Sequence, residues 1–369
     1  MKNNLIIGAG ITGITLARCI AEKGENVVVV EKRPHIGGNC YDYFDDDGNY
    51  VKPYGPHIFH TKHEDVYAFL SRFTKFKTYK HKVYAEVDEK LYTLPFNYDG
   101  IRQAFDKKTA SRIISRLEFV YGKNKNVSIL DLMKVKDDYY LKTLGDFVYE
   151  KIFLNYTLKQ WDIKPEDISP EVTNRVPIFT GKSKDYFRED PYQGIPEHGF
   201  TSMFQHILNH KNITLMTNMD YNDLVLDTFD RVFVTSPIDE FFKYKYGKLK
   251  YRRISIVLEK KLTDKFQSNS VINHPNANGF TRITEFNHFL KVKSDSTVIG
   301  TEYPSWEKGF LAYPVLTPEN HEIYEKYKVD ADAMENTFFV GRLAEYKYLN
   351  IDICVKHALK LIEDIEWSK

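Results

Sequence analysis

Short apolar runs on either side of a helical pattern open the chain. Residues 5–7 form an apolar run that ends in Gly8, residues 14–21 carry apolar positions at helical spacing, and residues 26–30 form a second apolar run that closes at Glu31. Apolar runs that flank a helix in this way are typical of strands lying parallel in a buried sheet. This part of the sequence therefore predicts a strand–helix–strand unit.

The spacing of hydrophobic residues predicts three further regions before buried strands occur again. Alternation over 79–97 predicts a β-hairpin, apolar spacing of three and four over 99–152 predicts helices, and the proline-rich residues 160–195 predict a long ordered loop. Later runs predict an antiparallel sheet over 250–304, further strands of the first sheet at 213–216, 231–235 and 337–340, and a C-terminal amphipathic helix over 351–365. The first and last segments of the chain are thus expected to share one domain.

Composition narrows the classes of function. Lys and Arg number 52 against 51 Asp and Glu, and this net charge of +1 argues against a nucleic-acid-binding surface. A hydrophobic content of 42% supports a packed core, and the 15% of aromatic residues also suit a cleft for flat, partly polar ligands. No stretch is apolar and long enough for a signal sequence or a membrane span, so we expect a soluble, cytoplasmic protein without membrane insertion.

A glycine-rich turn carries the first candidate chemistry. Gly8, Gly10 and Gly13 form a GxGxxG pattern between a predicted strand and a helix. In that context the glycines permit a tight turn, close approach of a pyrophosphate and close helix–strand packing, while the helix N-terminus offers N–H groups to phosphates. Glu31, at the end of the second strand, is placed to bind a ribose. Together these features favour a dinucleotide site over a purely structural turn.

The residues after Glu31 distinguish between dinucleotides. Arg33 and the pair Gly37–Gly38 follow directly, and glycines there allow the chain to pass over a pyrophosphate towards a flat ring. This arrangement resembles the FAD-binding fold of amine oxidases, and no second GxGxxG exists for a nicotinamide domain. We therefore expect a flavin enzyme whose overall reaction can be redox-neutral.

The predicted fold class is α/β, a Rossmann-like FAD-binding domain with a helical bundle insertion and an antiparallel β-sheet domain. The predicted FAD-binding domain comprises residues 1–78, 196–240 and 330–369, the helical substrate-binding domain 98–170, and the sheet domain 79–97, 171–195 and 241–329.

Two histidines, His57 and His60, could suggest a metal site. No carboxylate or cysteine lies nearby at ligand spacing, and the three cysteines, Cys19, Cys40 and Cys354, form no paired motif, so we expect no bound metal and no disulfide framework. The alternatives are loop histidines bonded to the backbone, or a flavin-facing loop in which His57 tunes flavin protonation.

Six segments together resemble bacterial UDP-galactopyranose mutases and occur in the order found in that family. They are residues 31–39, 55–60, 155–161, 186–196, 280–285 and 341–348. The resemblance spans nearly the whole chain and implies an intramolecular transferase that converts UDP-galactopyranose to UDP-galactofuranose for cell-surface polysaccharides. In that family the N5 atom of reduced FAD attacks the anomeric carbon, UDP leaves, and the sugar ring opens and recloses through another hydroxyl. The resemblance also implies a nucleotide-sugar substrate, an external reductant such as NAD(P)H, and a homodimer.

The resemblance assigns roles to individual residues. Arg175 on a mobile loop and Arg282 on the sheet would clamp the diphosphate, because guanidinium groups bind phosphates in a bidentate manner. Tyr156 would stack on the pyrimidine, Trp161 would flank the sugar, and Arg342 would bind the FAD pyrophosphate. The predicted catalytic residues are Arg175, Arg282, His57 and Trp161; the predicted substrate-binding residues are Tyr156, Thr157, Trp161, Arg175, Tyr186, Arg282, Tyr313 and Tyr348; and the predicted cofactor-binding residues are Gly8, Gly10, Ile11, Thr12, Gly13, Glu31, Lys32, Arg33, Gly38, Asn39, His57, Ile58, Arg342 and Asn350. Taken singly, each arginine could be a surface ion-pair partner and each tyrosine a core residue.

Departures from the family pattern leave the substrate open. Asn350 stands where the family has Asp, His81 where it has Asn, and residues 152–155 differ from the usual aromatic and Lys-Gly residues. The substrate could therefore be UDP-N-acetylgalactosamine, UDP-arabinopyranose or dTDP-fucopyranose. Two further classes compete: a flavin amine-oxidase-like oxidoreductase, which gives no reason for paired Arg175 and Arg282, and a non-enzymatic binding module on the same fold.

Overall fold

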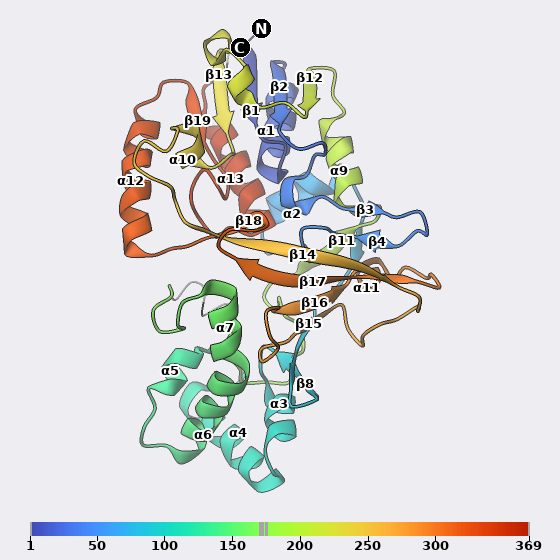
Figure 1. The fold of residues 1–369 in the computed structure, drawn as a ribbon, viewed down its shortest axis with the longest axis vertical. Helices are drawn as coiled ribbons and strands as arrows, with labels where there is room; N and C mark the ends of the chain where they lie inside the picture. Colours follow the sequence, from blue (N-terminus) through green and yellow to red (C-terminus); the bar gives the residue numbers. More distant parts are fainter. Residues whose placement is uncertain (1, 170–172, 174–175, 368–369) are drawn as a thin grey trace.

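A computed structural model describes residues 2–169, 173 and 176–367. A five-stranded parallel sheet in the order β12-β2-β1-β13-β19 forms one end of the molecule (Figure 1). Its strands are β1 (Asn3–Ile7), β2 (Asn26–Glu31), β12 (Ile213–Thr217), β13 (Arg231–Val234) and β19 (Thr337–Phe339). They come from both ends and the middle of the chain, and the β-branched residues of β2 suit a buried strand. Helix α1 (Ile11–Glu22) packs against α9 (Gly199–Leu208) and α13 (Ile351–Asp364).

A seven-stranded sheet crosses the middle of the molecule in the order β18-β14-β17-β16-β15-β7-β8 (Figure 1). Its strands are β7 (Val83–Val87), β8 (Lys90–Leu94), β14 (Tyr251–Lys261), β15 (Val271–Asn273), β16 (Arg282–Glu285), β17 (Thr297–Ser305) and β18 (Phe310–Pro314). The β15–β7 pair is parallel and the other neighbours are antiparallel. The register places Arg282 of β16 opposite both Asn273 of β15 and Glu302 of β17.

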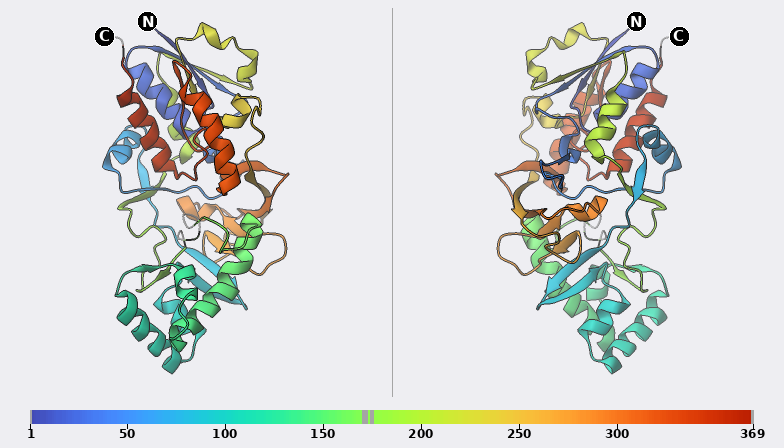
Figure 2. Two further views of the ribbon diagram at one scale, coloured as in Figure 1. Left: turned by 90° about the vertical axis from the view of Figure 1, so that its left-hand side faces the viewer. Right: turned by 90° about the vertical axis from the view of Figure 1, so that its right-hand side faces the viewer.

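A helical lobe lies at the end opposite the parallel sheet in Figures 1 and 2. It contains α3 (Tyr98–Ala104), α4 (Lys107–Tyr121), α5 (Ile129–Met133), α6 (Tyr139–Val148), the π-helical turn η2 (Tyr149–Phe153) and α7 (Leu154–Trp161). The side chains of Asn97, Asp106 and Asp138 begin α3, α4 and α6 by accepting hydrogen bonds from backbone N–H groups of the first turn. The lobe therefore has locally specified helix starts and packs its apolar positions inward.

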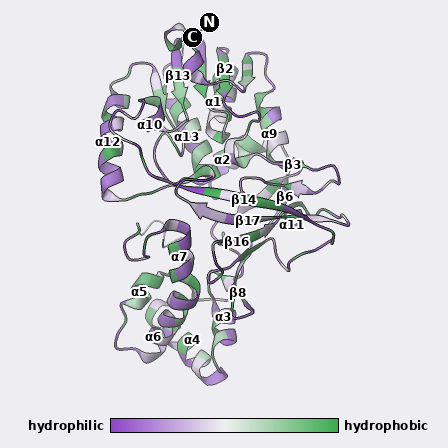
Figure 3. Ribbon diagram, in the orientation of Figure 1, coloured by the Kyte–Doolittle hydropathy of each residue, from purple (hydrophilic) through white to green (hydrophobic). Residues whose placement is uncertain are grey.

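The remaining elements connect these three parts. They are η1 (Gly38–Cys40), β3 (Tyr43–Phe44), β4 (Tyr50–Val51), β5 (Phe59–Thr61), α2 (Glu64–Ser71), β6 (Phe76–Thr78), β9 (Asn126–Val127), β10 (Ile178–Phe179), β11 (Tyr192–Pro196), η3 (Tyr221–Asp223), η4 (Leu226–Thr228), α10 (Ile238–Phe241), α11 (Asn287–Leu290) and α12 (Pro318–Asp332). Helix α12 lies on the outside and is largely hydrophilic in Figure 3. No helix in the described ranges is long and apolar enough to cross a membrane.

The α/β fold class is confirmed, and so are most of the predicted elements. The strand–helix–strand unit, the hairpin within 79–97, the helices over 99–152, the strands over 250–304 and the last helix all occur. Three kinds of detail differ. Strands β10 and β11 interrupt the predicted loop over 160–195, β19 is half-buried because it is an edge strand, and helices α2, α9 and α12 were not predicted. The division into three domains at the stated boundaries stays a prediction.

The glycine-rich turn fixes how tightly β1 and α1 approach each other. A Cβ atom on Gly13 would lie 2.0 Å from the Gly8 carbonyl oxygen, and Gly8 itself has φ +104° with Thr235 Oγ1 2.4 Å from its would-be Cβ. By contrast, a Cβ on Gly10 would meet no atom of the described chain within 4 Å. Gly8 and Gly13 are thus required by packing, whereas Gly10 leaves open space.

We expect Gly13→Ala to destabilise the protein by about 1–3 kcal/mol, because the methyl group forces α1 away from the turn. Gly10→Ala is the matched control and should cost the cofactor-free protein less than about 1 kcal/mol. Thermal and urea unfolding of both variants measure this difference. Equal stability of the two variants would contradict the packing role assigned to Gly13.

Candidate functional site

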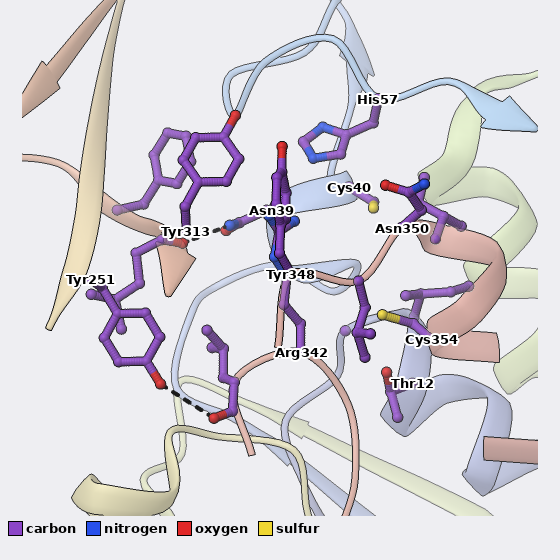
Figure 4. Close-up of a pocket in the computed structure, with 18 of the residues that line it drawn as sticks. Thr12, Asn39, Cys40, His57, Tyr251, Tyr313, Arg342, Tyr348, Asn350 and Cys354 are labelled. Atoms are coloured by element: carbon purple, nitrogen blue, oxygen red, sulfur yellow. Dashed lines mark hydrogen bonds between the residues drawn. The ribbon is translucent and has the colours of Figure 1, made fainter. Parts of the chain in front are cut away.

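A cavity of about 1160 Å³ begins at the carboxyl ends of β1, β2 and β13 and continues between the two large sheets. In open α/β sheets ligands bind outside the carboxyl ends of the parallel strands. Figure 4 shows part of this cavity, with the 341–354 segment beside Asn39, His57 and the start of α1. Its lining residues form two regions, one at the parallel sheet and one at the central sheet.

The turn after β1 forms the first region. Gly8, Gly10 and Thr12 line the cavity at the N-terminus of α1, and Gly10 leaves room for a group to approach the backbone. The Glu31 carboxylate accepts hydrogen bonds from the backbone N–H groups of Ala9 and Arg33, each at 2.9 Å. The turn and the acid at the end of β2 are therefore held in a fixed relation.

A second glycine turn continues the same wall. Gly37 has φ +91° and Gly38 φ +55°, and a Cβ on Gly38 would lie 3.3 Å from the Cα of Gly10. Asn39 accepts a hydrogen bond from the Arg33 guanidinium at 3.1 Å and donates one to the Leu311 carbonyl at 3.0 Å. Asn39 thus joins the parallel-sheet end of the cavity to β18 of the central sheet.

Arg342 presents unsatisfied donors to this wall. Its Nε and Nη2 atoms are buried and have no hydrogen-bond partner among the described residues. The guanidinium lies over the rings of Tyr313 and Tyr348, 5.2 and 4.7 Å from their centroids, and the preceding Gly341 packs on Thr12. Because buried guanidinium donors without acceptors are costly, the arrangement is built for an acceptor-rich ligand.

The start of α13 closes the same region. Asn350 is the N-cap residue of α13 and lines the cavity together with Ile351 and Cys354 (Figure 4). Burial raises the pKa of the Cys354 thiol to about 11 and that of Cys40 to about 12. Both cavity thiols are therefore neutral near pH 7 and unsuited to act as nucleophiles.

The second region centres on Arg282. Its Nε and Nη2 donate to Glu302 Oε2 at 2.8 and 2.7 Å. Burial lowers the pKa of Arg282, but the charge of the Glu302 carboxylate outweighs it and holds the pKa well above its usual value. Burial in turn raises the pKa of Tyr156 and of Tyr313. A fixed cation therefore faces phenolic O–H groups that remain protonated.

Three histidines line the cavity near this cation. His57 Nδ1 lies 3.0 Å from the Gly55 carbonyl oxygen, so Nδ1 carries the hydrogen and Nε2 is the acceptor. Burial, with Lys52, lowers the pKa of His57 to about 3, and burial, with Arg282, lowers that of His81 to about 3. His60 Nδ1 lies 2.6 Å from Asp190 Oδ2, and its ring stacks on Phe187.

The structure gathers most of the predicted site residues around one cavity. Those that line it are Gly8, Gly10, Ile11, Thr12, Glu31, Lys32, Arg33, Gly38, Asn39, His57, Ile58, Tyr156, Tyr186, Arg282, Tyr313, Arg342, Tyr348 and Asn350. Gly13 lies behind the turn, and Thr157 is buried outside the lining. Trp161 is also outside it, with its ring 5.3 and 6.1 Å from those of Tyr313 and Tyr348. Arg175 lies outside the described residues, so its predicted role stays a prediction.

Sequence reasoning missed Asn273. This residue is buried, lines the cavity and pairs in register with Arg282, and its Oδ1 has no partner within the described chain. An Asn at the end of an apolar strand just before the 280–285 segment was the available signal, but its proximity to Arg282 depends on strand pairing. Among residues 2–169, 173 and 176–367, no cluster of His, Cys, Asp or Glu is arranged to hold a metal ion.

Comparisons with known proteins show which protein families and solved structures this chain resembles. The family model for NAD(P)-binding Rossmann-like domains matches residues 6–73, and the model for UDP-galactopyranose mutase matches residues 151–348. A crystal structure of reduced UDP-galactopyranose mutase shares the fold with a TM-score of 0.74 at 15% identity, covering 98% of this chain and 95% of that one. A redesigned putrescine oxidase matches with a TM-score of 0.59 at 11% identity over 98% of both chains. These two solved structures show the fold that the chain shares with them.

Sequence relatives define the family. The chain is 33% identical to dTDP-fucopyranose mutase of Escherichia coli, over 98% of this chain and 97% of that protein. It is 32% identical to a probable UDP-galactopyranose mutase of Klebsiella pneumoniae, over 98% and 94% of the two chains. The chain belongs to the UDP-galactopyranose mutase family. It is accordingly an isomerase-type enzyme of the flavin-dependent nucleotide-sugar mutases, and the two competing classes are set aside.

We expect Arg342→Met to weaken cofactor retention at least about tenfold, because hydrogen bonds from a buried charged group are lost. The cofactor-free variant should be at least as stable as the wild type, since the unsatisfied donors disappear with the guanidinium. Flavin content after dialysis and thermal midpoints with and without flavin measure both effects. The exposed Arg102→Met is the control, and a variant that retains flavin like this control would refute the assignment.

The low pKa of His57 predicts a neutral imidazole with its hydrogen on Nδ1 between about pH 5 and 8. The unfolded chain binds a proton near pH 6.5 but the folded chain only near pH 3, so His57 lowers stability progressively as pH falls below 6.5. Nitrogen-15 NMR of the imidazole rings tests the tautomer, with exposed His321 as the solvent-accessible reference. An imidazolium signal from His57 at pH 6 would contradict this account.

Proposed function

We propose that this protein uses reduced FAD to interconvert the pyranose and furanose forms of a nucleotide sugar, with UDP-galactopyranose as the first candidate substrate. The observation that supports this most is the single cavity joining a dinucleotide turn to a buried arginine among phenols. Membership of the mutase family limits the class of reaction, and the chemistry of the lining residues suggests how each would contribute.

The residues of the first region fit FAD. The open space at Gly10, the N-terminus of α1 and the unsatisfied Arg342 suit a pyrophosphate, and Glu31 suits a ribose. Gly38, Asn39, His57 and Asn350 would lie along the remainder of the cofactor. When bound and reduced, the flavin supplies a nucleophilic nitrogen, N5, towards the anomeric carbon.

The residues of the second region suit a departing diphosphate. Arg282 uses Nε and Nη2 on Glu302 and keeps further N–H donors for phosphate oxygens. Tyr156 would stack on the base, and Tyr186, Tyr313 and Tyr348 would donate phenolic hydrogen bonds to the diphosphate. Trp161 would support Tyr313 and Tyr348 from behind, next to the sugar.

Ring opening and reclosure require protons to move between sugar hydroxyls. His57, with its hydrogen on Nδ1 bound to the Gly55 carbonyl, offers Nε2 as an acceptor beside the proposed cofactor. A neutral imidazole adds no positive charge next to Arg282 and Arg342. His57 would therefore orient a sugar hydroxyl group by accepting its hydrogen bond at Nε2 while the two arginines bind the anion.

A second candidate substrate is dTDP-fucopyranose. The 33% identity to dTDP-fucopyranose mutase is as high as that to UDP-galactopyranose mutases, and Asn350 and His81 depart from the latter pattern at cavity positions. UDP-N-acetylgalactosamine and UDP-arabinopyranose stay further candidates. We also propose NAD(P)H or a similar external reductant, a homodimer, a cytoplasmic location and a role in cell-surface polysaccharides.

Turnover of a substrate panel by the holoenzyme tests the proposed function. The protein, reduced with dithionite, would be incubated separately with UDP-galactofuranose, its N-acetyl analogue, UDP-arabinofuranose and dTDP-fucofuranose, and pyranose products separated by chromatography. We expect turnover of one nucleotide sugar well above the others and none by the oxidised protein. No turnover of any substrate by protein that holds reduced flavin would refute the proposal.

Arg282→Lys tests the phosphate role without removing the partner of Glu302. A lysine can pair with Glu302 but lacks the guanidinium fork, so kcat/KM should fall at least about thirtyfold, corresponding to about 2 kcal/mol of binding. Arg282→Ala should fall further, by about 2–5 kcal/mol in all. Both variants should keep their flavin absorbance, and exposed Arg112→Ala should behave as wild type. Unchanged kinetics of Arg282→Ala would contradict the assignment.

A further inference from the structure

Two separate segments form the walls of the second region. Helix α7 carries Tyr156 and Trp161, while the β15–β16 hairpin carries Asn273 and Arg282 on either side of its turn. Tyr156, Asn273 and Arg282 line the same cavity. The width of this part of the cavity therefore depends on whatever holds α7 against the hairpin turn.

Lys159 of α7 joins these two walls. Its Nζ atom donates hydrogen bonds to the carbonyl oxygens of His274, Ala277 and Phe280, at 2.6, 2.7 and 2.7 Å. An ammonium group has three N–H donors and no acceptor, so the three carbonyls use its full donor capacity. One side chain of α7 thus binds the backbone at three points of the turn between Asn273 and Arg282.

Other hydrogen bonds also hold α7 against the central sheet and the hairpin turn. Arg252 of β14 donates from Nε and Nη2 to the carbonyl oxygens of Gln160 and Lys159, both at 2.9 Å, and so binds the last turn of α7. At the other end of α7, Asn155 Nδ2 donates to Asn276 Oδ1 of the hairpin turn at 2.9 Å. Lys159 lies between these contacts and is the one that touches both ends of the turn.

The three hydrogen bonds of Lys159 require its ammonium form, because a neutral amine has only two N–H donors. Burial lowers the pKa of Lys159 to about 8, which still leaves the group charged near pH 7. The titratable groups around it are His274, whose pKa burial lowers, Glu86 at 3.9 Å from His274, and Arg252 and Asp162 at the end of α7. An apolar side chain at 159 would leave these three carbonyl oxygens without their donor, and a glutamine, with two N–H donors on a shorter side chain, cannot replace all three hydrogen bonds.

We propose that Lys159 is a positioning residue that fixes the distance between Tyr156 on α7 and Arg282 on the hairpin, and so sets the affinity for the nucleotide part of the substrate. The assignment rests on the proposed binding of a nucleotide diphosphate in this region. It assigns Lys159 no contact with substrate or cofactor. Its effect therefore falls on binding and leaves the rearrangement of the sugar largely unchanged.

Lys159→Met in the flavin-loaded protein tests this role against Lys151→Met. Lys151 lies just before α7 and makes one exposed ion pair with Asp88 at 3.2 Å, so it is a matched control. We expect Lys159→Met to raise both the KM of the substrate and the Kd of UDP or dTDP by at least about tenfold, with kcat within about threefold of wild type. Lys151→Met should leave all three constants unchanged.

Amide hydrogen exchange gives a readout that needs no ligand. Residues 274–281 should exchange faster in Lys159→Met than in the wild type and in Lys151→Met, while flavin absorbance stays the same. Lys159→Gln serves as the second variant if Lys159→Met does not fold, with the same expectations. Wild-type exchange together with wild-type KM and Kd would overturn the proposal, as would a loss confined to kcat.

The two proposals fail differently. A wild-type protein that binds neither UDP nor dTDP would refute the proposed function, and faster exchange of 274–281 in Lys159→Met would then still establish that Lys159 holds the two walls together. Normal nucleotide binding by the wild type with no change in Lys159→Met would refute only the positioning role.

Discussion

The ion pair between Arg282 and Glu302 is the interaction on which the site depends. It joins neighbouring strands β16 and β17 of the central sheet and lies in a small side cavity of about 60 Å³ that also touches Asn39, His57 and Arg342. Separating such a pair would leave a buried charge without a partner, which is far more costly than breaking an exposed pair. The pair therefore holds a cation at a fixed place between the parallel sheet and the helical lobe. Glu302 Oε1 is buried and has no hydrogen-bond partner within the described chain, so it can accept a further hydrogen bond at this place.

Aromatic rings stabilise the buried positive charge near Arg282 and Arg342. Tyr313 and Tyr348 pack edge to face, with ring centroids 5.0 Å apart, and Trp161 lies against both. Arg342 lies over the two tyrosines, which is favourable for a partly desolvated guanidinium. The high aromatic content of the chain therefore has two uses: most rings fill the core, and a smaller group forms a rigid wall whose hydroxyl groups can donate to an anion.

Short sequence patterns correctly predicted the parts of the site whose structure depends only on neighbouring residues. The turn from Gly8 to Gly13 follows from steric limits on a strand entering a helix, and Glu31 follows from its place at the end of the next strand. Arg342 and Asn350 carry no such local pattern, and they entered the predictions only through the resemblance to a family. Their proximity to Thr12 depends on α13 packing against α1, two segments from opposite ends of the chain.

The residues that were missed depend on contacts between distant segments. Asn273 reaches Arg282 through strand pairing, and Lys159 reaches its three carbonyls across the gap between a helix and a hairpin. Nothing in the neighbouring sequence of either residue specifies those partners. Trp161 likewise entered only through the resemblance to a family: its ring lies against Tyr313 and Tyr348 outside the cavity lining, and its place beside the sugar stays a prediction.

The central claim is that one cavity keeps the nucleotide bound while the bond between sugar and diphosphate breaks and re-forms. Positional isotope exchange tests this most directly, using a nucleotide sugar with a heavy oxygen isotope in the bridge between the anomeric carbon and the diphosphate. The account predicts that the reduced holoenzyme moves the label into non-bridging positions of the same phosphate, and that the oxidised protein does not. A label that stays in the bridge while the reduced enzyme interconverts the two sugar forms would contradict it.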